Sequence, residues 1–155
     1  MIYSELETEI GSIYILEEKG KITGLTYDKE EIGDIEQRSS SLLEKAERQL
    51  TEYFEGRRKN FDLPIELKGT DFQVKVWKAL EKIPYGETKS YQEIAEEVAS
   101  PKAFRAVGNA NNKNPISIII PCHRVIGKSG KLAGYGGGLD KKEYLLNLEK
   151  QFKKN

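Results

Sequence analysis

The only cysteine and the only histidine of this 155-residue chain are neighbours, in the run Pro121-Cys122-His123-Arg124. A thiol reacts as its thiolate, and a nearby imidazole or guanidinium favours that form. One interpretation is therefore a nucleophilic Cys122 that His123 activates. The alternative is a small buried side chain at the end of an apolar segment. Neighbours on a regular strand point to opposite faces, so adjacency alone leaves both interpretations open.

The same residue counts exclude several other kinds of site. One cysteine cannot form an internal disulfide or a cysteine-based zinc cluster. No set of His, Cys and carboxylates has the spacing of zinc ligands either, so we expect no metal site. An unpaired thiol is typical of a reducing compartment, which predicts a cytoplasmic protein. The apolar run 118–121 is too short to span a membrane, and the N-terminus lacks a secretory signal pattern.

Charge is unevenly distributed although the net charge is zero. Residues 1–66 carry 9 Lys and Arg against 16 Asp and Glu, a net of −7, whereas residues 67–155 carry 16 against 9, a net of +7. A basic half indicates a polyanionic partner. Two oppositely charged surfaces that attract each other within the chain are the alternative.

Residues 1–66 are predicted to form an α/β domain. Stretches rich in Ile, Tyr and Thr predict strands, and apolar side chains at helical spacing predict one helix. The expected elements are strands at 10–16 and 21–27, a helix from a capping box at Ser41 to Gly56, and a linker with an edge strand at 57–67.

Residues 67–155 are predicted to be mainly helical. The expected elements are helices at 72–83, 91–98 and 102–111 with Thr70, Ser90 and Ser100 as caps, a buried strand at 116–120, a turn at 127–130, a glycine-rich loop at 134–138 and a last helix capped by Asp140. Two short helices joined closely are typical of a helix-turn-helix, with Arg105 placed to face DNA. The alternative is a helix of small residues packed on another element, with Arg105 in solvent.

Taken together, these residues resemble the O6-alkylguanine–DNA alkyltransferase family. The run Ile120-Pro121-Cys122-His123-Arg124-Val125 matches the active-site signature of that family. Other motifs have its order and spacing, namely Pro84-Tyr85-Gly86-Glu87-Thr88 with Ser90-Tyr91, Arg105-Ala106-Val107-Gly108, Asn114-Pro115 and Gly134-Tyr135. The resemblance is strong over residues 69–150 and weak in the N-terminal part.

The resemblance implies a fold and an activity. The fold is an N-terminal α/β domain with a small antiparallel sheet and a helix, similar to ribonuclease H, and then a mainly α domain with a helix-turn-helix of the winged-helix type. The activity is DNA repair: the protein binds double-stranded DNA through the minor groove, flips out the alkylated guanine and transfers the alkyl group irreversibly to its own cysteine. No cofactor is needed, each molecule reacts once, and we expect a monomer.

The resemblance also assigns a catalytic function to four residues. Cys122 is the alkyl acceptor, and His123 is the base that removes the thiol proton by way of a water. Glu149 orients the imidazole, as the third group of a triad-like relay. Tyr91 protonates the departing guanine, because a leaving group that gains a proton leaves more easily.

Further residues are assigned by the resemblance to DNA and to the base pocket. Arg105 enters the duplex and fills the gap left by the flipped base. The other DNA-contacting residues are Ser90, Ala106 and Gly108. Asn114 braces the active-site turn, and the base pocket is formed by Val125, Tyr135, Gly136 and Gly137, with the Gly136 N–H directed at the base oxygen.

Three rival functions remain. The first is a non-catalytic helix-turn-helix protein that binds DNA or recognises damage, although relatives of that kind carry another residue, usually Trp, in place of Cys122. The second is a cysteine hydrolase, and the third is a structural domain with a buried thiol.

Phe104, just before Arg105, is bulkier than the residue that the family pattern leads us to expect. It either packs inward or alters how the recognition helix contacts DNA.

Overall fold

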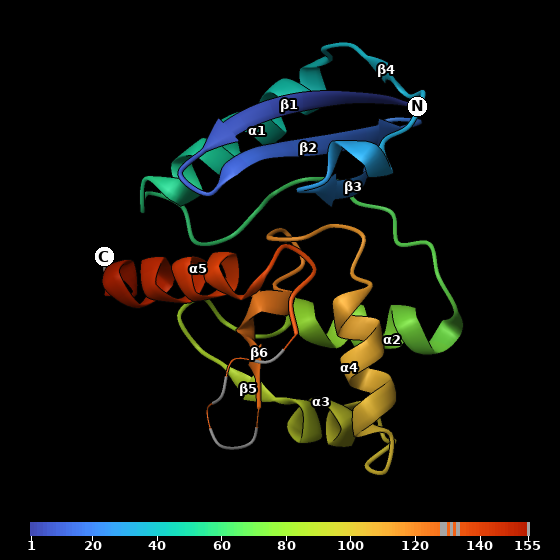
Figure 1. The fold of residues 1–155 in the computed structure, drawn as a ribbon, viewed down its shortest axis with the longest axis vertical. Coiled ribbons are helices and arrows are strands. Elements are labelled where there is room, and N and C mark those ends of the chain that lie inside the picture. The colour runs from blue at the N-terminus through green and yellow to red at the C-terminus, as the bar shows by residue number, and fades with distance from the viewer. Residues whose placement is uncertain (128–129, 131, 133, 155) are drawn as a thin grey trace. The chain divides into compact units, whose positions relative to one another are not determined.

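A computed structural model of the chain describes residues 1–127, 130, 132 and 134–154. These residues form two compact units (Figure 1). The first unit contains residues 1–67 and, from much later in the chain, residues 115–119. The second contains residues 68–114 and 120–154. Within the described residues, no helix is long and apolar enough to cross a membrane.

A four-stranded mixed sheet is the framework of the first unit. Its strands are β1 (Ile2–Thr8), β2 (Gly11–Glu18), β3 (Lys21–Thr26) and β4 (Glu36–Gln37), in the order β3-β2-β1-β4. β1 to β3 are antiparallel, and β4 is parallel to β1. The edge strand expected in the linker is reduced to one parallel bridge between Ile65 and Ile22.

Helix α1 (Ser41–Phe54) packs on the strands β1, β2 and β3 (Figure 1). Its inward face carries Leu43, Leu50 and Tyr53, all fully buried. The N-cap is Ser40, whose hydroxyl accepts the Leu43 N–H at 3.0 Å, so the predicted cap at Ser41 is wrong by one residue. The cap must have an extended backbone, and Ser40 has it, with φ −152° and ψ 164°.

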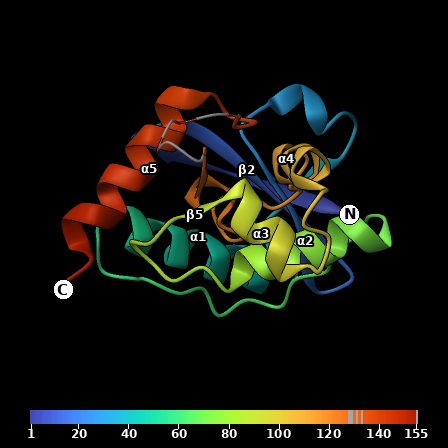
Figure 2. The same ribbon diagram turned by 90° about the horizontal axis from the view of Figure 1, so that it is seen from below.

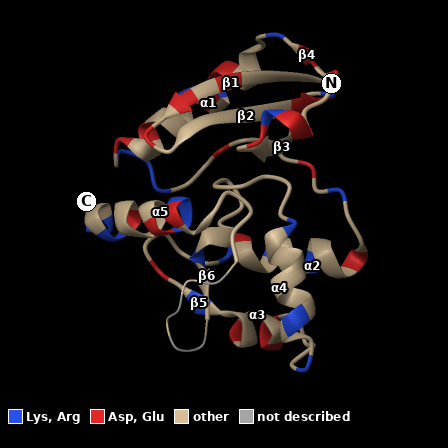
Figure 3. Ribbon diagram, in the orientation of Figure 1, with Lys and Arg blue, Asp and Glu red and all other residues tan. Residues whose placement is uncertain are grey.

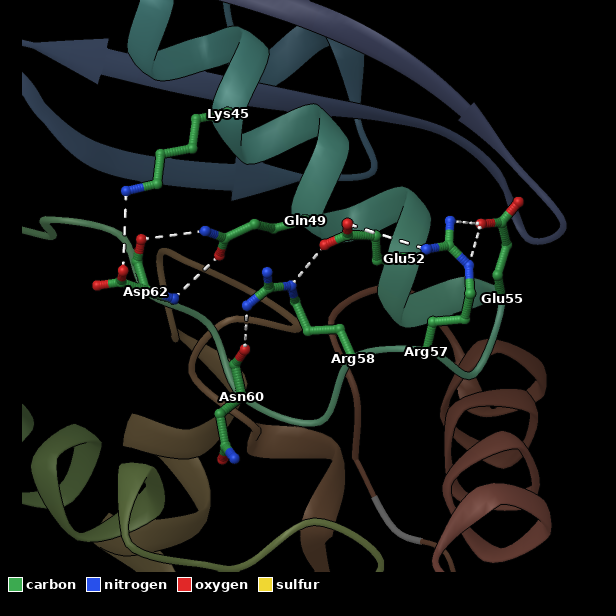
Figure 4. A network of polar contacts seen from close by, with 8 residues as sticks. All are labelled: Lys45, Gln49, Glu52, Glu55, Arg57, Arg58, Asn60 and Asp62. Carbon is green, nitrogen blue, oxygen red and sulfur yellow. Dashed lines mark hydrogen bonds and ion pairs between the residues drawn. The ribbon is translucent and has the colours of Figure 1, made fainter. Parts of the chain in front are cut away.

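The predicted linker after α1 is fixed by side chains rather than by strand pairing (Figure 4). The Gln49 amide donates to the Asp62 carbonyl at 3.1 Å and accepts the Asp62 N–H at 2.9 Å. Arg58 donates to the Glu52 carboxylate at 2.8 Å and to the Asn60 carbonyl at 3.0 Å. The Asp62 N–H and carbonyl and the Asn60 carbonyl therefore find side-chain partners before the chain reaches the bridge at Ile65.

Residues 115–119 belong to the first unit because they pair with β3. The Leu25 N–H donates to the Pro115 carbonyl at 2.9 Å, and the Ser117 N–H donates to the Leu25 carbonyl at 3.3 Å. The strand predicted at 116–120 is wrong as a regular strand. After the bridge at Ile116 the chain turns at Ile118, whose φ of +71° is rare for a β-branched residue.

The second unit is mainly helical. Its elements are α2 (Asp71–Glu81), β5 (Lys89–Ser90), α3 (Tyr91–Glu97), α4 (Phe104–Asn112), the 3-10 turn η2 (Cys122–Arg124), β6 (Val125–Ile126) and α5 (Leu139–Phe152). Helices α3 and α4 lie side by side in both views (Figure 1, Figure 2). The indole N–H of Trp77 on α2 donates to the Ala110 carbonyl of α4 at 2.8 Å, which ties a third helix to this pair.

The helix starts of the second unit follow the predictions only in part. The capping boxes at Thr70 and Ser90 are both present. The prediction for Ser100 is wrong, because α4 begins at Phe104 after Ala103, which makes no side-chain cap. The prediction for Asp140 is also wrong, because α5 begins one residue after Gly138. The turn expected at 127–130 includes residues 128 and 129, which lie outside the described residues.

Candidate active site

The strands β5 and β6 pair in parallel, and this pairing brings the start of α3 close to the end of the 3-10 turn η2, which contains Cys122. In this pair Lys89 lies opposite the fully buried Val125, and Ser90 lies opposite Ile126. Tyr91 follows β5 directly, so its phenol and the thiol of Cys122 share one region. Burial raises the pKa of Tyr91, and the negative charge of Cys122 as a thiolate raises it further.

Cys122 is only 3% exposed and lies in a turn that two asparagines hold. The Cys122 N–H donates to the Ile120 carbonyl at 2.8 Å. Asn114 donates its amide to that same carbonyl at 2.7 Å, and Asn111 donates to the Cys122 carbonyl at 3.3 Å. Sequence reasoning named Asn114 but missed Asn111, since a helix ending in several asparagines gives no sign of which ones turn inward.

His123, Arg124 and Glu149 form a buried polar assembly next to the cysteine. His123 Nε2 lies 2.6 Å from Glu149 Oε2. Arg124 donates to both carboxylate oxygens, from Nε at 2.8 Å and from Nη2 at 3.0 Å, and its third nitrogen donates to the Ile83 carbonyl at 2.6 Å. The Gly86 N–H adds a further bond to Glu149 Oε1 at 3.1 Å. The contact of Arg124 was missed, although it belongs to the signature run.

The environment sets the charges of this assembly. Burial alone would raise the pKa of the Glu149 carboxyl, but the His123 ring and the Arg124 guanidinium hold the net pKa below its usual value. Burial lowers the pKa of His123, although Glu149 opposes that shift. We therefore assign an ionised Glu149 and a neutral imidazole that donates from Nε2. Nδ1 then keeps its lone pair, and it is buried without a hydrogen bond to any group in the described part of the chain.

Lys142 is a fully buried cation near the same thiol. Its ammonium donates to the Gly134 carbonyl at 3.2 Å and lies 6.0 Å from the centre of the Tyr91 ring. Burial lowers the pKa of Lys142 to about 8, and the charge of Cys122 opposes that shift. Sequence reasoning missed this residue. Its signal is a position on the inner face of α5, three residues before the buried Leu145.

An open groove of about 450 Å³ lies beside these residues in the second unit. Its lining consists of Tyr91, Phe104, Arg105, Gly108, Asn109, Asn112 and Gly134. Of the residues assigned to DNA, Arg105 and Gly108 therefore line the groove. Ala106 is exposed on the same helix outside it, and Ser90 caps α3 by accepting the Glu93 N–H at 3.1 Å.

Gly134, the first residue of the glycine-rich loop, also lines this groove. Gly134 has a φ of +63°, and a Cβ there would lie 2.8 Å from the Asn112 side-chain oxygen. Tyr135 and Gly137 are half-buried, and Gly136 is exposed. A Cβ at Gly136 would be in ordinary contact with the Asn112 carbonyl, at 3.6 Å, so space alone does not require glycine there.

Comparison with known proteins decides the family. The profile of the 6-O-methylguanine DNA methyltransferase DNA-binding domain matches residues 71–151, and the profile of the ribonuclease-like domain of that enzyme matches residues 1–67. This chain belongs to the 6-O-methylguanine DNA methyltransferase family. The resemblance and the fold class expected from sequence, an α/β domain followed by a helical one, are thereby confirmed.

Relatives in this family are similar over nearly the whole chain. The constitutive methylated-DNA–protein-cysteine methyltransferase of Bacillus subtilis (strain 168) is 49% identical over 156 residues, covering 96% of this chain and 94% of the relative. The Methanosarcina barkeri (strain Fusaro) protein is 50% identical over 153 residues, covering 96% and 97%. The crystal structure of Mycobacterium tuberculosis OGT in complex with DNA has a TM-score of 0.92 and 46% identity, covering 98% of this chain and 94% of that one.

The described residues contain no group of three or more His, Cys, Asp and Glu that could hold a metal ion.

Proposed function

We propose that this chain repairs DNA by moving the alkyl group of O6-alkylguanine to the sulfur of Cys122, once per molecule. The observation that carries the proposal is the buried His123–Glu149–Arg124 assembly, in which His123 directly follows the cysteine in the chain. The relatives support it, because their names specify methylated DNA as the substrate and a protein cysteine as the acceptor. They also favour transfer over the non-catalytic DNA-binding alternative.

His123 acts as the base of the transfer. Its Nε2–H is directed at Glu149, so Nδ1 is the free basic nitrogen that takes the Cys122 proton, with one water relaying it. Glu149 stabilises the positive imidazole that results, and Arg124 keeps Glu149 ionised throughout. The positive charge of Lys142 favours the thiolate further, because opposite charges stabilise each other in a buried site.

The thiolate lone pair then forms a bond to the alkyl carbon, and the bond between that carbon and O6 breaks. The electron pair remains on guanine, which takes a proton from the Tyr91 phenol at its ring nitrogen. Tyr91 regains a proton from the His123 cation, so the proton lost by Cys122 ends on guanine. The products are S-alkylcysteine and guanine in the DNA. The raised pKa of Tyr91 keeps the phenol protonated until guanine requires the proton.

DNA binding is proposed for the face that carries α4. Residues 98–139 contain six Lys and Arg and no Asp or Glu, and α4 has no acidic segment (Figure 3). Such a surface is suited to a phosphate backbone. The chain binds the duplex as a monomer through the minor groove, and Arg105 occupies the space of the flipped guanine.

The base pocket completes the proposal. Ser90, Ala106 and Gly108 contact the DNA, and Asn114 braces the active-site turn. Val125 and residues 135–137 enclose the flipped base, with the Gly136 N–H donating to its oxygen. The chain has a single cysteine, which cannot form an internal disulfide, and this supports a location in the reducing cytoplasm.

Mass spectrometry of the intact protein tests this function. The protein is mixed with a duplex that contains one O6-methylguanine, and its peptides are then mapped. We expect the mass of one added methylene on the peptide that holds Cys122, saturating at one per protein. The Cys122→Ser variant should bind the duplex and gain no mass. If the parent protein binds the duplex with a free thiol and also gains no mass, transfer is excluded and the non-catalytic alternative stands.

A further inference from the structure

Phe104 places an aromatic ring in solvent at the start of α4. Its side chain is 47% exposed. Within residues 1–127, 130, 132 and 134–154, only Met1 and Leu139 are large apolar residues with comparable exposure. The sequence alone allows an inward-packed ring at this position, and the observed exposure excludes it. An exposed ring on a functional surface requires a partner to become buried.

The neighbours of Phe104 indicate the chemistry of that partner. The ring lines the open groove together with Tyr91 and Arg105. The guanidinium carbon of Arg105 lies 6.0 Å from the centre of the Phe104 ring. The groove therefore combines a flat apolar surface with a cation that reaches into the same space.

Charge favours a nucleic acid base over an apolar protein segment as the occupant. The acid-free stretch 98–139 includes the whole of α4, and Lys102 is exposed two residues before Phe104. A polyanion is attracted to this surface, and its bases have flat faces that stack on aromatic side chains. An apolar wedge beside a cation is also the combination that opens base steps from the minor groove.

We infer that Phe104 is a second wedge residue, which stacks on the base next to the gap while Arg105 fills the gap itself. This inference rests on the proposed function. Removing a guanine from the duplex exposes the face of the neighbouring base, and the cost of that lost stacking opposes flipping. A ring that covers the exposed face offsets this cost only when the guanine is out. Phe104 thus selects the flipped state rather than adding general affinity.

Binding measurements on four variants test the inference. All variants carry Cys122→Ser so that no alkyl transfer occurs, and each duplex contains O6-methylguanine or guanine at one position. We expect Phe104→Ala to bind the lesion duplex about tenfold more weakly, as stacking on one base implies. We expect a smaller loss for the guanine duplex, near-parent affinity for Phe104→Trp, and an intermediate value for Phe104→Leu. Leu139→Ala, which removes an equally exposed apolar side chain at 48%, should bind as the parent does.

Two further readouts separate stacking from other effects. The slope of log affinity against log salt should be unchanged in Phe104→Ala, because the ring neutralises no phosphate. In Lys102→Ala the slope should become less steep by about one, because one phosphate contact is lost. A 2-aminopurine placed beside the lesion should become brighter in the Phe104→Ala complex than in the parent complex, because its exposed face is no longer covered. Thermal melting checks that each variant is folded.

Each result bears on the inference separately from the proposed function. Equal losses for Phe104→Ala and Leu139→Ala, or equal losses on both duplexes, would overturn a wedge at the flipped base. Unchanged affinity and unchanged 2-aminopurine fluorescence in Phe104→Ala would overturn it as well. Failure of the unmodified protein to gain a methylene mass would instead overturn the transfer function, whichever way Phe104 behaves.

Discussion

Arg124 and Glu149 lie 25 residues apart in the chain and meet as a buried two-point ion pair. Their side chains are 7% and 1% exposed. The rigid fork of Arg124 fixes the plane of the carboxylate, and that carboxylate in turn fixes the ring of His123. Arg124 is therefore a positioning residue, which acts on the reaction through two other side chains.

Removal of the Arg124 fork should destabilise the protein strongly. Arg124→Met leaves Glu149 buried without its main partner, which costs about 3–5 kcal/mol. Arg124→Lys keeps the charge and loses the two-point geometry, so its cost is smaller. Urea unfolding measures both. Arg57→Met is the matched control, because Arg57 pairs with carboxylates on the surface and is 61% exposed, and it should cost less than about 1 kcal/mol. Similar losses for Arg57→Met and Arg124→Met would contradict the special position of the buried pair.

The Glu149 carboxylate should make the protein sensitive to acid. Its pKa in the folded state lies below the unfolded value of 4.5, so its stabilisation is complete above pH 4.5 and is lost as the pH falls towards the folded pKa. Glu149→Gln should be less stable than the parent at pH 7, and the two should converge in acid. Glu143→Gln, at an exposed position on the same helix, should follow the parent curve. Unfolding at several pH values tests this, and parallel curves for parent and Glu149→Gln would refute it.

The Lys142 cation should lower stability while it supports reactivity. Its folded pKa of about 8 lies below the unfolded 10.5, so the parent protein should gain stability between pH 8 and 10.5 as the buried charge is lost. Lys142→Met should remove that gain. At pH 7 the variant should transfer the alkyl group about tenfold more slowly, because the Cys122 thiolate loses a nearby positive charge. Unfolding curves and single-turnover transfer rates measure the two effects, and an unchanged rate would exclude the electrostatic contribution.

Gly33 and Gly134 have nearly the same backbone conformation, so alanine variants of the two can distinguish backbone strain from an effect on the groove. Gly134 and Gly33 have φ values of +63° and +62°, and a Cβ would meet nothing within 4 Å at Gly33. Alanine at either position should cost about 1 kcal/mol for the left-handed backbone. Gly134→Ala should in addition displace the Asn112 side chain in the groove and slow transfer from DNA several-fold. Thermal melting and transfer rates test both variants, and equal transfer rates would show that the groove tolerates the change.

Local signals account for the parts of the fold that the sequence predicted. The Thr70 and Ser90 capping boxes are sequence patterns with their own hydrogen bonds, so they could be read directly. Strand β1 was missed because Glu5 and Glu7 interrupt its apolar pattern, and its stability comes from neighbouring strands on both sides. The start of α4 was misplaced because Ser100-Pro101 resembles a helix start, whereas the chain forms a turn there.

The active site, like the fold, could be predicted from the sequence only in part. The signature around Cys122 identified the nucleophile and its base through the resemblance. Glu149 on its own is an unremarkable helix carboxylate, and its burial depends on Arg124, which comes from another element. Lys142 lies on the apolar face of its helix, where the periodicity predicts an apolar residue. The pattern therefore shows that a lysine interrupts this face but not what the lysine does. These residues become a site only through contacts that cross the fold.

Because residues 115–119 belong to the first unit, the N-terminal domain cannot be exchanged between relatives as residues 1–67 alone. The profiles meet between residues 67 and 71, which suggests a simple cut. However, Leu25 bonds to Pro115 and Ser117, so a fragment that ends at residue 67 keeps an open strand edge, and a fragment that begins at 68 carries an apolar segment with no sheet to join. A chimaera that takes its N-terminal half from a relative must therefore inherit residues 115–119 from that same relative. Recombination within this family is thus expected to keep two distant stretches of sequence together.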